Sequence, residues 1–179
     1  TSSALTVTLS KIDQTALTVA ATPATVPYGS TSTLSTTGGN GNGAVTYGTD
    51  TSTGCSVTGN TLSVINASGT CSVTATKAAD SNYNAVTSSA LTVTLAIANQ
   101  SALTVAATPA TVPYGSTSTL STTGGSSTGV VTFSAGASTG CSVTGSTLSV
   151  INVSGTCIVT ATKAADANYN AVTSSALTV

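Results

Sequence analysis

The most reactive side chains of this sequence are four cysteines, arranged as two pairs of equal spacing. Cys55 and Cys71 lie sixteen positions apart, and Cys141 and Cys157 repeat that interval. Such thiols can form disulfides, stay reduced in a core or bind a metal. A structural zinc site needs two close cysteine pairs, or cysteine with histidine, and the chain has no His and no Glu. We therefore expect the disulfides Cys55–Cys71 and Cys141–Cys157 and an oxidising compartment, with buried free thiols or metal as the alternatives.

Ionisable side chains are scarce. The chain has three Lys, no Arg and four Asp, and its net charge is −1. Without His or Glu, neither a nucleophile with its base nor a pair of catalytic carboxylates can be assembled. We expect no enzyme, no catalytic residue and no cofactor. A basic patch for nucleic acid is also missing, and no apolar run approaches the ~20 residues that span a bilayer, so we expect neither nucleic acid nor membrane insertion.

Two acidic corners carry the remaining candidates for a site. Asp80 and Tyr83 belong to Asp-Ser-Asn-Tyr, and Asp166 and Tyr169 belong to Asp-Ala-Asn-Tyr. A lone carboxylate is a poor ligand set for calcium, which takes six to eight oxygens. We predict instead that each Asp caps its own backbone in a turn. Each Tyr is predicted to pack its ring inward and to bond its hydroxyl to backbone, as a structural residue, and no metal site is expected.

Three modifications remain open as alternatives. Lys77 and Lys163 suggest an isopeptide bond to an asparagine, a reaction that needs a buried acid beside the pair. Asn66 and Asn152 each begin an Asn-x-Ser triplet that matches the N-glycosylation pattern. Sugars on the Ser and Thr side chains would also cover a surface that carries little charge.

The elements that position these residues occur twice. Cys55 aligns with Cys141, and Tyr83 with Tyr169, without a gap and at a shift of 86 residues. The segment TSSALTV begins the chain and returns at 87–93 and 173–179. We interpret residues 1–9 as the closing strand of a preceding module, residues 10–95 as the first repeat and residues 96–179 as the second.

Apolar and hydroxyl side chains alternate through each repeat, as in strands with one buried face. Pro23 is predicted to mark an edge or a crossing between sheets. Val26-Pro27-Tyr28-Gly29 is predicted to form a turn, and Gly59-Asn60 a hairpin that places Cys55 opposite Val64. The predicted strands of the first repeat are 17–22, 30–36, 44–47, 55–58, 61–65, 71–76 and 85–95, with a mobile loop at 38–43. This pattern predicts an all-β chain of two tandem immunoglobulin-like sandwiches with about seven antiparallel strands each.

The end of each repeat resembles a known family. GTCSVTATKAADSNYNAVTSSALTVTL and GTCIVTATKAADANYNAVTSSALTV are similar to the last two strands of bacterial immunoglobulin-like repeats of large cell-surface proteins and adhesins. The resemblance covers residues 10–179 and implies a bacterial extracellular or cell-surface setting without catalytic residues. Unlike antibody domains, the chain has no Trp. Cys55 and Cys71 are also closer in sequence than the usual inter-sheet cystine, so we expect this bridge to tie neighbouring segments at one end of the sandwich.

These observations favour a structural spacer whose partners are the neighbouring repeats of the same array. The linkers SKIDQT at 10–15 and AIANQS at 96–101 are short and lack Gly and Pro, which favours a semi-rigid stack. One alternative is a self-assembling filament, a homopolymer in which residues 1–9 add to a sheet edge of another chain. A second is an adhesin module that binds an unknown surface ligand or glycan through loop 38–43 and its counterpart 124–129.

Overall fold

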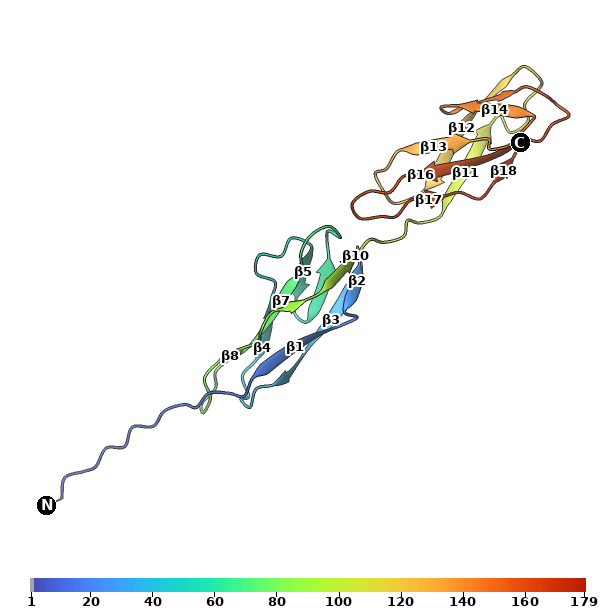
Figure 1. The fold of residues 1–179 in the computed structure, drawn as a ribbon. Helices are drawn as coiled ribbons and strands as arrows, with labels where there is room; N and C mark the ends of the chain where they lie inside the picture. The colour runs from blue at the N-terminus through green and yellow to red at the C-terminus, as the bar shows by residue number, and fades with distance from the viewer. Residues whose placement is uncertain (1) are drawn as a thin grey trace. The chain divides into compact units, whose positions relative to one another are not determined.

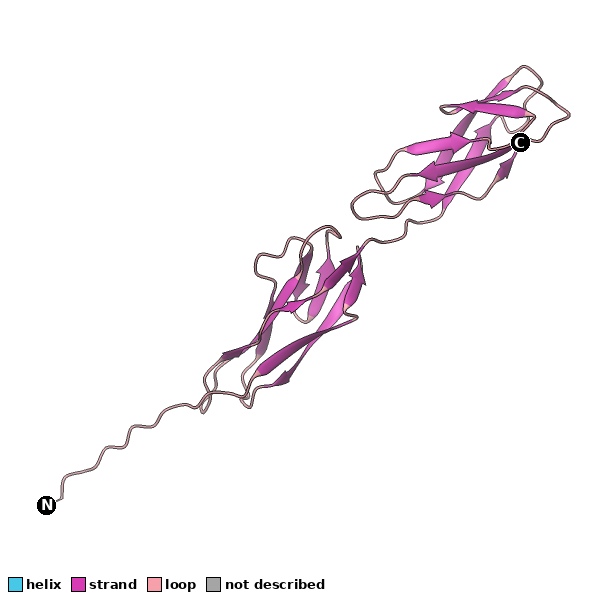
Figure 2. Cartoon of the chain, in the orientation of Figure 1, coloured by secondary structure: helices cyan, strands magenta, loops and turns pink. Residues whose placement is uncertain are grey.

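The computed structural model describes residues 2–179, and these residues form strands, turns and loops without a helix. They divide into two compact units, of which unit 1 ends at Ala96 and unit 2 comprises Ile97–Val179 (Figures 1 and 2). The described residues thus include no helix that could cross a membrane. Residue 1, the first residue of the predicted closing strand 1–9, lies outside the described residues.

Unit 1 consists of two four-stranded antiparallel arrangements and one parallel pair. The first sheet has the order β1-β3-β6-β5, the second has the order β4-β7-β8 with β9 also paired to β7, and β2 pairs with β10. The strands are β1 (Leu17–Thr22), β2 (Thr25–Pro27), β3 (Thr31–Gly38), β4 (Val45–Gly48), β5 (Cys55–Thr58), β6 (Thr61–Val64), β7 (Ser72–Lys77), β8 (Val86–Thr87), β9 (Leu91–Thr92) and β10 (Thr94–Ala96).

The core of unit 1 lies between these sheets, because the predicted alternation sends apolar side chains to one face of each strand. Leu34 of β3 and Leu62 of β6 come from the first sheet, and Val73 of β7 comes from the second. All three are at most 2% exposed. Threonine and serine cover the opposite faces, as in Thr31 and Thr33 of β3, so the unit is sandwich-like, with one buried and one hydroxyl-rich face per sheet.

Unit 2 repeats the two four-stranded arrangements of unit 1. Its first sheet has the order β11-β12-β15-β14, and its second has the order β13-β16-β17 with β18 also paired to β16. The strands are β11 (Leu103–Thr108), β12 (Thr117–Gly124), β13 (Val131–Ser134), β14 (Cys141–Thr144), β15 (Thr147–Val150), β16 (Ile158–Lys163), β17 (Val172–Thr173) and β18 (Leu177–Thr178).

The hairpin prediction is confirmed, and the turn prediction is wrong by one residue. Cys55 lies opposite Val64 in the β5–β6 ladder. The predicted turn at Val26-Pro27-Tyr28-Gly29 begins instead at Pro27, whose carbonyl accepts a hydrogen bond from the Ser30 N–H at 3.0 Å. Gly29 supplies the positive φ of +73° that this turn requires. The shift leaves Thr25–Pro27 free to form β2, in parallel with β10.

Pro23 separates β1 from β2, at the point where the chain leaves the first sheet. Its missing N–H makes it compatible with this crossing, which confirms the prediction. The crossing is fixed by Ser32, whose buried hydroxyl donates to the Pro23 carbonyl at 2.7 Å. Ser118 and Pro109 form the same bond in unit 2.

The predicted single strand 85–95 is interrupted and forms β8, β9 and β10. The interruption is caused by Ser88, which is 7% exposed. Its backbone N–H donates to the Ala75 carbonyl, whereas its side-chain hydroxyl accepts from the Ala75 N–H at 3.0 Å. A side chain thus takes the place of a backbone carbonyl in the ladder. Ser174 and Ala161 repeat this arrangement in unit 2.

Candidate functional site

The acidic corner of unit 1 is organised by the carboxylate of Asp80. Oδ1 accepts hydrogen bonds from the backbone N–H groups of Asn82 and Tyr83, both at 2.8 Å. Oδ2 accepts from the Asn42 N–H at 2.6 Å, across 38 positions of sequence. These three donors, led by Asn42, hold the pKa of Asp80 below its ordinary value of 3.8. The carboxylate therefore caps a turn and also binds the loop at 38–43, which we call the glycine-rich loop.

The glycine-rich loop is held by three further side chains. Lys77 donates from Nζ to the Gly39 carbonyl at 3.0 Å, and Gln14 accepts from the Gly41 N–H at 3.0 Å. Asn40 accepts from the Thr15 N–H at 3.0 Å. We call Gln14, Lys77, Asp80 and the loop residues 39–42 the corner network. The sequence predicts a mobile loop at 38–43, whereas these contacts attach the loop to the corner and the linker.

The linker that leads into unit 1 belongs to the same network. Ile12 forms a parallel bridge with Tyr83, in which the Ile12 N–H donates to the Asn82 carbonyl at 3.0 Å and the Ile12 carbonyl accepts from the Asn84 N–H at 2.9 Å. Gln14, which is 8% exposed, donates from Nε2 to the Asn84 carbonyl at 2.8 Å. The incoming chain is therefore fixed to the corner before β1 begins.

Unit 2 builds an equivalent network from different loop residues. Asp166 accepts from the Thr128 N–H at 2.8 Å, and its pKa is lowered mainly by this bond and by the Asn168 N–H. Gln100 accepts from the Ser127 N–H at 3.0 Å and donates to the Asn170 carbonyl at 2.7 Å. Residues 40–42 of unit 1 are Asn-Gly-Asn, and their counterparts 126–128 in unit 2 are Ser-Ser-Thr. The hydrogen bonds that Asp166 and Gln100 accept therefore depend on the backbone N–H groups of the loop.

Tyr83 and Tyr169 are both half-buried. The Tyr83 N–H donates to Asp80, and the Tyr83 carbonyl accepts from the Asp80 N–H at 3.1 Å. Tyr169 and Asp166 form the same pair of bonds. The structure thus places both tyrosines in the corners with a structural role for their backbone, and the predicted hydroxyl bond stays a prediction.

Gln14 and Gln100 were not singled out by sequence reasoning, which treated both linkers as connections. A signal was nevertheless present. When SKIDQT is aligned with AIANQS, glutamine is the residue that both linkers share. An amide side chain supplies both donors and an acceptor, which is what a buried position between a loop N–H and two carbonyls requires.

The structure joins the two cysteines of each copy in a disulfide, as the sequence predicts. The Cα atoms of Cys55 and Cys71 are 5.5 Å apart, and those of Cys141 and Cys157 are 5.3 Å apart. The four cysteines are 2–8% exposed and belong to the cores. Closing a loop of this length stabilises a fold by roughly 3 kcal/mol in the chain-entropy model, and two such bonds indicate a non-reducing environment.

Each disulfide links the two sheets of its unit, which corrects our expectation of a bridge between neighbouring segments. Cys55 begins β5 in the first sheet, and Cys71 directly precedes β7 in the second. The crossing from β6 to β7 is short because the backbones approach closely at Gly54 and Gly69. A Cβ at Gly69 would lie 2.5 Å from the Gly54 nitrogen, so a side chain there would force the crossing apart.

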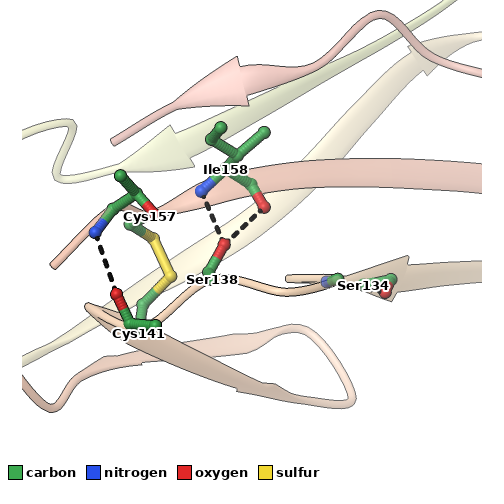
Figure 3. The surroundings of a disulfide bond; sticks show 8 residues. Ser134, Ser138, Cys141, Cys157 and Ile158 are labelled. Carbon is green, nitrogen blue, oxygen red and sulfur yellow. Dashed lines mark hydrogen bonds between the residues drawn. A yellow bond between two sulfur atoms is a disulfide. The ribbon is translucent and has the colours of Figure 1, made fainter.

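A serine hydroxyl supports the crossing beside each disulfide. Figure 3 shows Ser138 next to the Cys141–Cys157 bond, with its hydroxyl directed at the backbone of Ile158. The Ser138 hydroxyl accepts from the Ile158 N–H at 2.9 Å and donates to the Ile158 carbonyl at 3.1 Å. Ser52 makes the same two bonds to Ser72 in unit 1. The segment before β14 is therefore tied to the start of β16.

The remaining candidate side chains hydrogen-bond to nearby backbone groups. Lys77 and Lys163 direct their ammonium groups to the carbonyls of Gly39 and Gly125. Asn66 and Asn152 accept, through Oδ1, from the backbone N–H two residues later. Within residues 2–179, no cysteine is free and no three His, Cys, Asp or Glu side chains gather in a group that could hold a metal.

Comparisons with protein-family models, with curated proteins and with solved structures gave no match for this chain.

Proposed function

We propose that this chain is a non-catalytic structural spacer, formed by two immunoglobulin-like sandwiches of a bacterial extracellular or cell-surface protein. The sandwich-like units, each with one cystine between its sheets, support the proposed fold. The disulfides support an extracellular setting. The resemblance of the Asp-x-Asn-Tyr corners to bacterial surface repeats supports the source and the setting.

The main support for the spacer role is that the linker at 96–98 is hydrogen-bonded to unit 1 at one end and to unit 2 at the other. The Ala96 carbonyl accepts from the Tyr28 N–H at 2.8 Å within unit 1, and the Ala98 N–H donates to the Asn168 carbonyl at 2.8 Å within unit 2. A single residue, Ile97, separates these two attachment points. A connection of one residue leaves few backbone torsions to vary, which suits a module that transmits length or load along an array.

The spacer role can be tested through the freedom of the linker. A spectroscopic label is placed at exposed Ser56 and another at its counterpart Ser142, without new cysteines. We expect a narrow distribution of label distances in the parent chain and a broad one after insertion of Gly-Ser-Gly-Ser behind Ile97. The same insertion behind Gly136, an exposed turn position, is the control and should leave the distribution narrow. Equal widths for the parent and the Ile97 insertion would contradict the proposal.

A further inference from the structure

The glycine-rich loop of unit 1 contains the two Asn-Gly pairs of the chain, Asn40-Gly41 and Asn42-Gly43. An asparagine that precedes glycine can lose its side-chain amide, because the backbone nitrogen of the next residue can attack the amide carbon. Glycine favours this attack, since it has no Cβ and its backbone is less restricted than that of other residues. The counterparts in unit 2 are Ser126-Ser127 and Thr128-Gly129, which have no side-chain amide to lose.

The fold restrains the first of these pairs. The Gly41 nitrogen is the group that would attack; Gly41 is buried, and its N–H donates to Oε1 of Gln14 at 3.0 Å. The Asn40 side chain is also held, because its Oδ1 accepts from the Thr15 N–H at 3.0 Å. The attack needs a nitrogen that has lost its proton and an amide that can turn toward it. The corner network opposes both conditions at Asn40.

The second pair is less restrained. Asn42 is exposed, and its backbone N–H donates to Oδ2 of Asp80 at 2.6 Å. Among residues 2–179, neither the side-chain amide of Asn42 nor the Gly43 N–H has a hydrogen-bond partner. In unit 2, the Gly129 N–H donates to the Ser127 hydroxyl at 3.1 Å, a bond that Gly41 cannot supply in unit 1. Both reacting groups of the second pair are therefore available.

Glycine at position 43 is required by the packing of the loop. A side chain at Gly43 would meet the backbone carbonyl of Ala78, and one at Gly129 would meet that of Ala164. Both units therefore need glycine here, and the residue before it decides whether the position can react. That residue is asparagine in unit 1 and threonine in unit 2.

We propose that Asn42 is a site of spontaneous deamidation, which modifies unit 1 and spares unit 2. The Gly43 nitrogen forms a bond to Cγ of Asn42, the bond from Cγ to the side-chain nitrogen breaks, and the Gly43 amide proton leaves with the ammonia. Water then opens the cyclic imide at either carbonyl, which gives aspartate or isoaspartate. This modification goes beyond the spacer role and does not depend on it.

The product places a second carboxylate close to Asp80. Residue 42 donates its backbone N–H to Oδ2 of Asp80, so a negative charge on residue 42 is repelled by the ionised acceptor. Isoaspartate also lengthens the backbone of the loop by one methylene group. Both products therefore weaken the bond by which the acidic corner holds the glycine-rich loop.

Peptide mapping by mass spectrometry tests the site. The folded chain is incubated in mildly alkaline buffer, where more of the backbone nitrogen loses its proton, beside a reduced sample unfolded in guanidinium chloride. In the folded chain, Asn42 should show the mass gain of an amide that becomes a carboxyl group, while Asn40 stays unchanged. In the unfolded sample both should react. An unmodified Asn42 in the folded chain, or conversion of Asn40 at the same rate there, would overturn the proposal.

Two variants that copy unit 2 separate the positions. Asn42→Thr should abolish conversion in the loop. Asn40→Ser is the matched control, because Ser126 accepts from the Ser101 N–H at 3.1 Å as Asn40 does from Thr15, and it should convert at residue 42 like the parent. Asn42→Asp reproduces one product and should melt below the parent at neutral pH, with a smaller difference in acid, where carboxylates are protonated. Equal melting temperatures at neutral pH would contradict the effect on the loop.

Discussion

Asp80 shows how much one side chain can organise in a protein with so few charges. Its carboxylate receives three backbone N–H groups, from the corner and from the loop. Hydrogen bonds to a charged acceptor are among the stronger ones in proteins, and no salt bridge is needed to hold the loop. The ionised form is therefore the one that suits the folded corner.

A pH titration of stability should reveal this preference. The folded pKa of Asp80 and Asp166 lies below 3.8, which is the ordinary value. The stabilisation is thus complete above 3.8 and is lost as the pH falls through the folded value. We expect the melting temperature of the parent chain to fall in acid. Asp80→Asn with Asp166→Asn should melt lower at neutral pH and show a shallower acid decline.

Asp50 provides the matched control for that titration. It is exposed on the surface of unit 1. Its positive φ of 41° is also compatible with asparagine. Asp50→Asn should therefore keep the acid decline of the parent. An unchanged decline in the double corner variant would contradict the role assigned to the two carboxylates.

Among the elements of unit 1, the interruption of the closing strand at 85–95 has the largest effect on how the strands pair. A continuous strand from 85 to 95 would have kept the chain in one ladder, whereas Ser88 breaks it and allows β10 to reach β2. The Ser88 hydroxyl accepts from the Ala75 N–H and donates to the Ser89 carbonyl at 2.9 Å. At the break, the buried Ala75 N–H therefore keeps an acceptor.

Removal of this hydroxyl should destabilise both units. In Ser88→Ala with Ser174→Ala, the buried N–H groups of Ala75 and Ala161 lose their acceptors, which costs about 1–3 kcal/mol per unit. The neighbours Ser89 and Ser175 are exposed, so Ser89→Ala with Ser175→Ala should change the free energy of unfolding by less than about 0.5 kcal/mol. Urea denaturation followed by fluorescence measures both. Equal losses for the two pairs would show that the hydroxyl does not hold the ladder.

The sequence predicts those features that depend on local patterns. Alternation located β1, β3 and the β5–β6 hairpin to within two residues, because one buried face has a period of two. The cystines were predicted, but their position between the two sheets was missed, because the close approach of Gly54 and Gly69 joins segments that are not adjacent in sequence. β2 was missed because three residues carry too little pattern, and its partner lies about seventy positions away. The corner network depends on such distant contacts too.

At the scale of the whole molecule, the two units have nearly the same sequence and differ in how well their cores are covered. Unit 1 buries Val26, Val64 and Val93 to 3% exposure or less. Their counterparts Val112, Val150 and Val179 are half-buried. The difference is located where β10 covers unit 1, so we attribute it to the last strand and not to the composition of the core.

This attribution predicts that a short extension stabilises unit 2. Adding Thr-Leu-Ala after Val179 reproduces residues 94–96, and the new leucine should fill the cavity of about 260 Å³ that is lined by Val112, Val150 and Val179. Covering one partly buried leucine contributes about 1–2 kcal/mol, which raises the melting temperature of a unit of this size by roughly 4–16 °C. Calorimetry should show one of the two unfolding transitions at a higher temperature. Thr-Asp-Ala is the control, since it supplies the backbone without the apolar side chain. If both extensions stabilise unit 2 equally, backbone pairing and not the leucine side chain accounts for the gain.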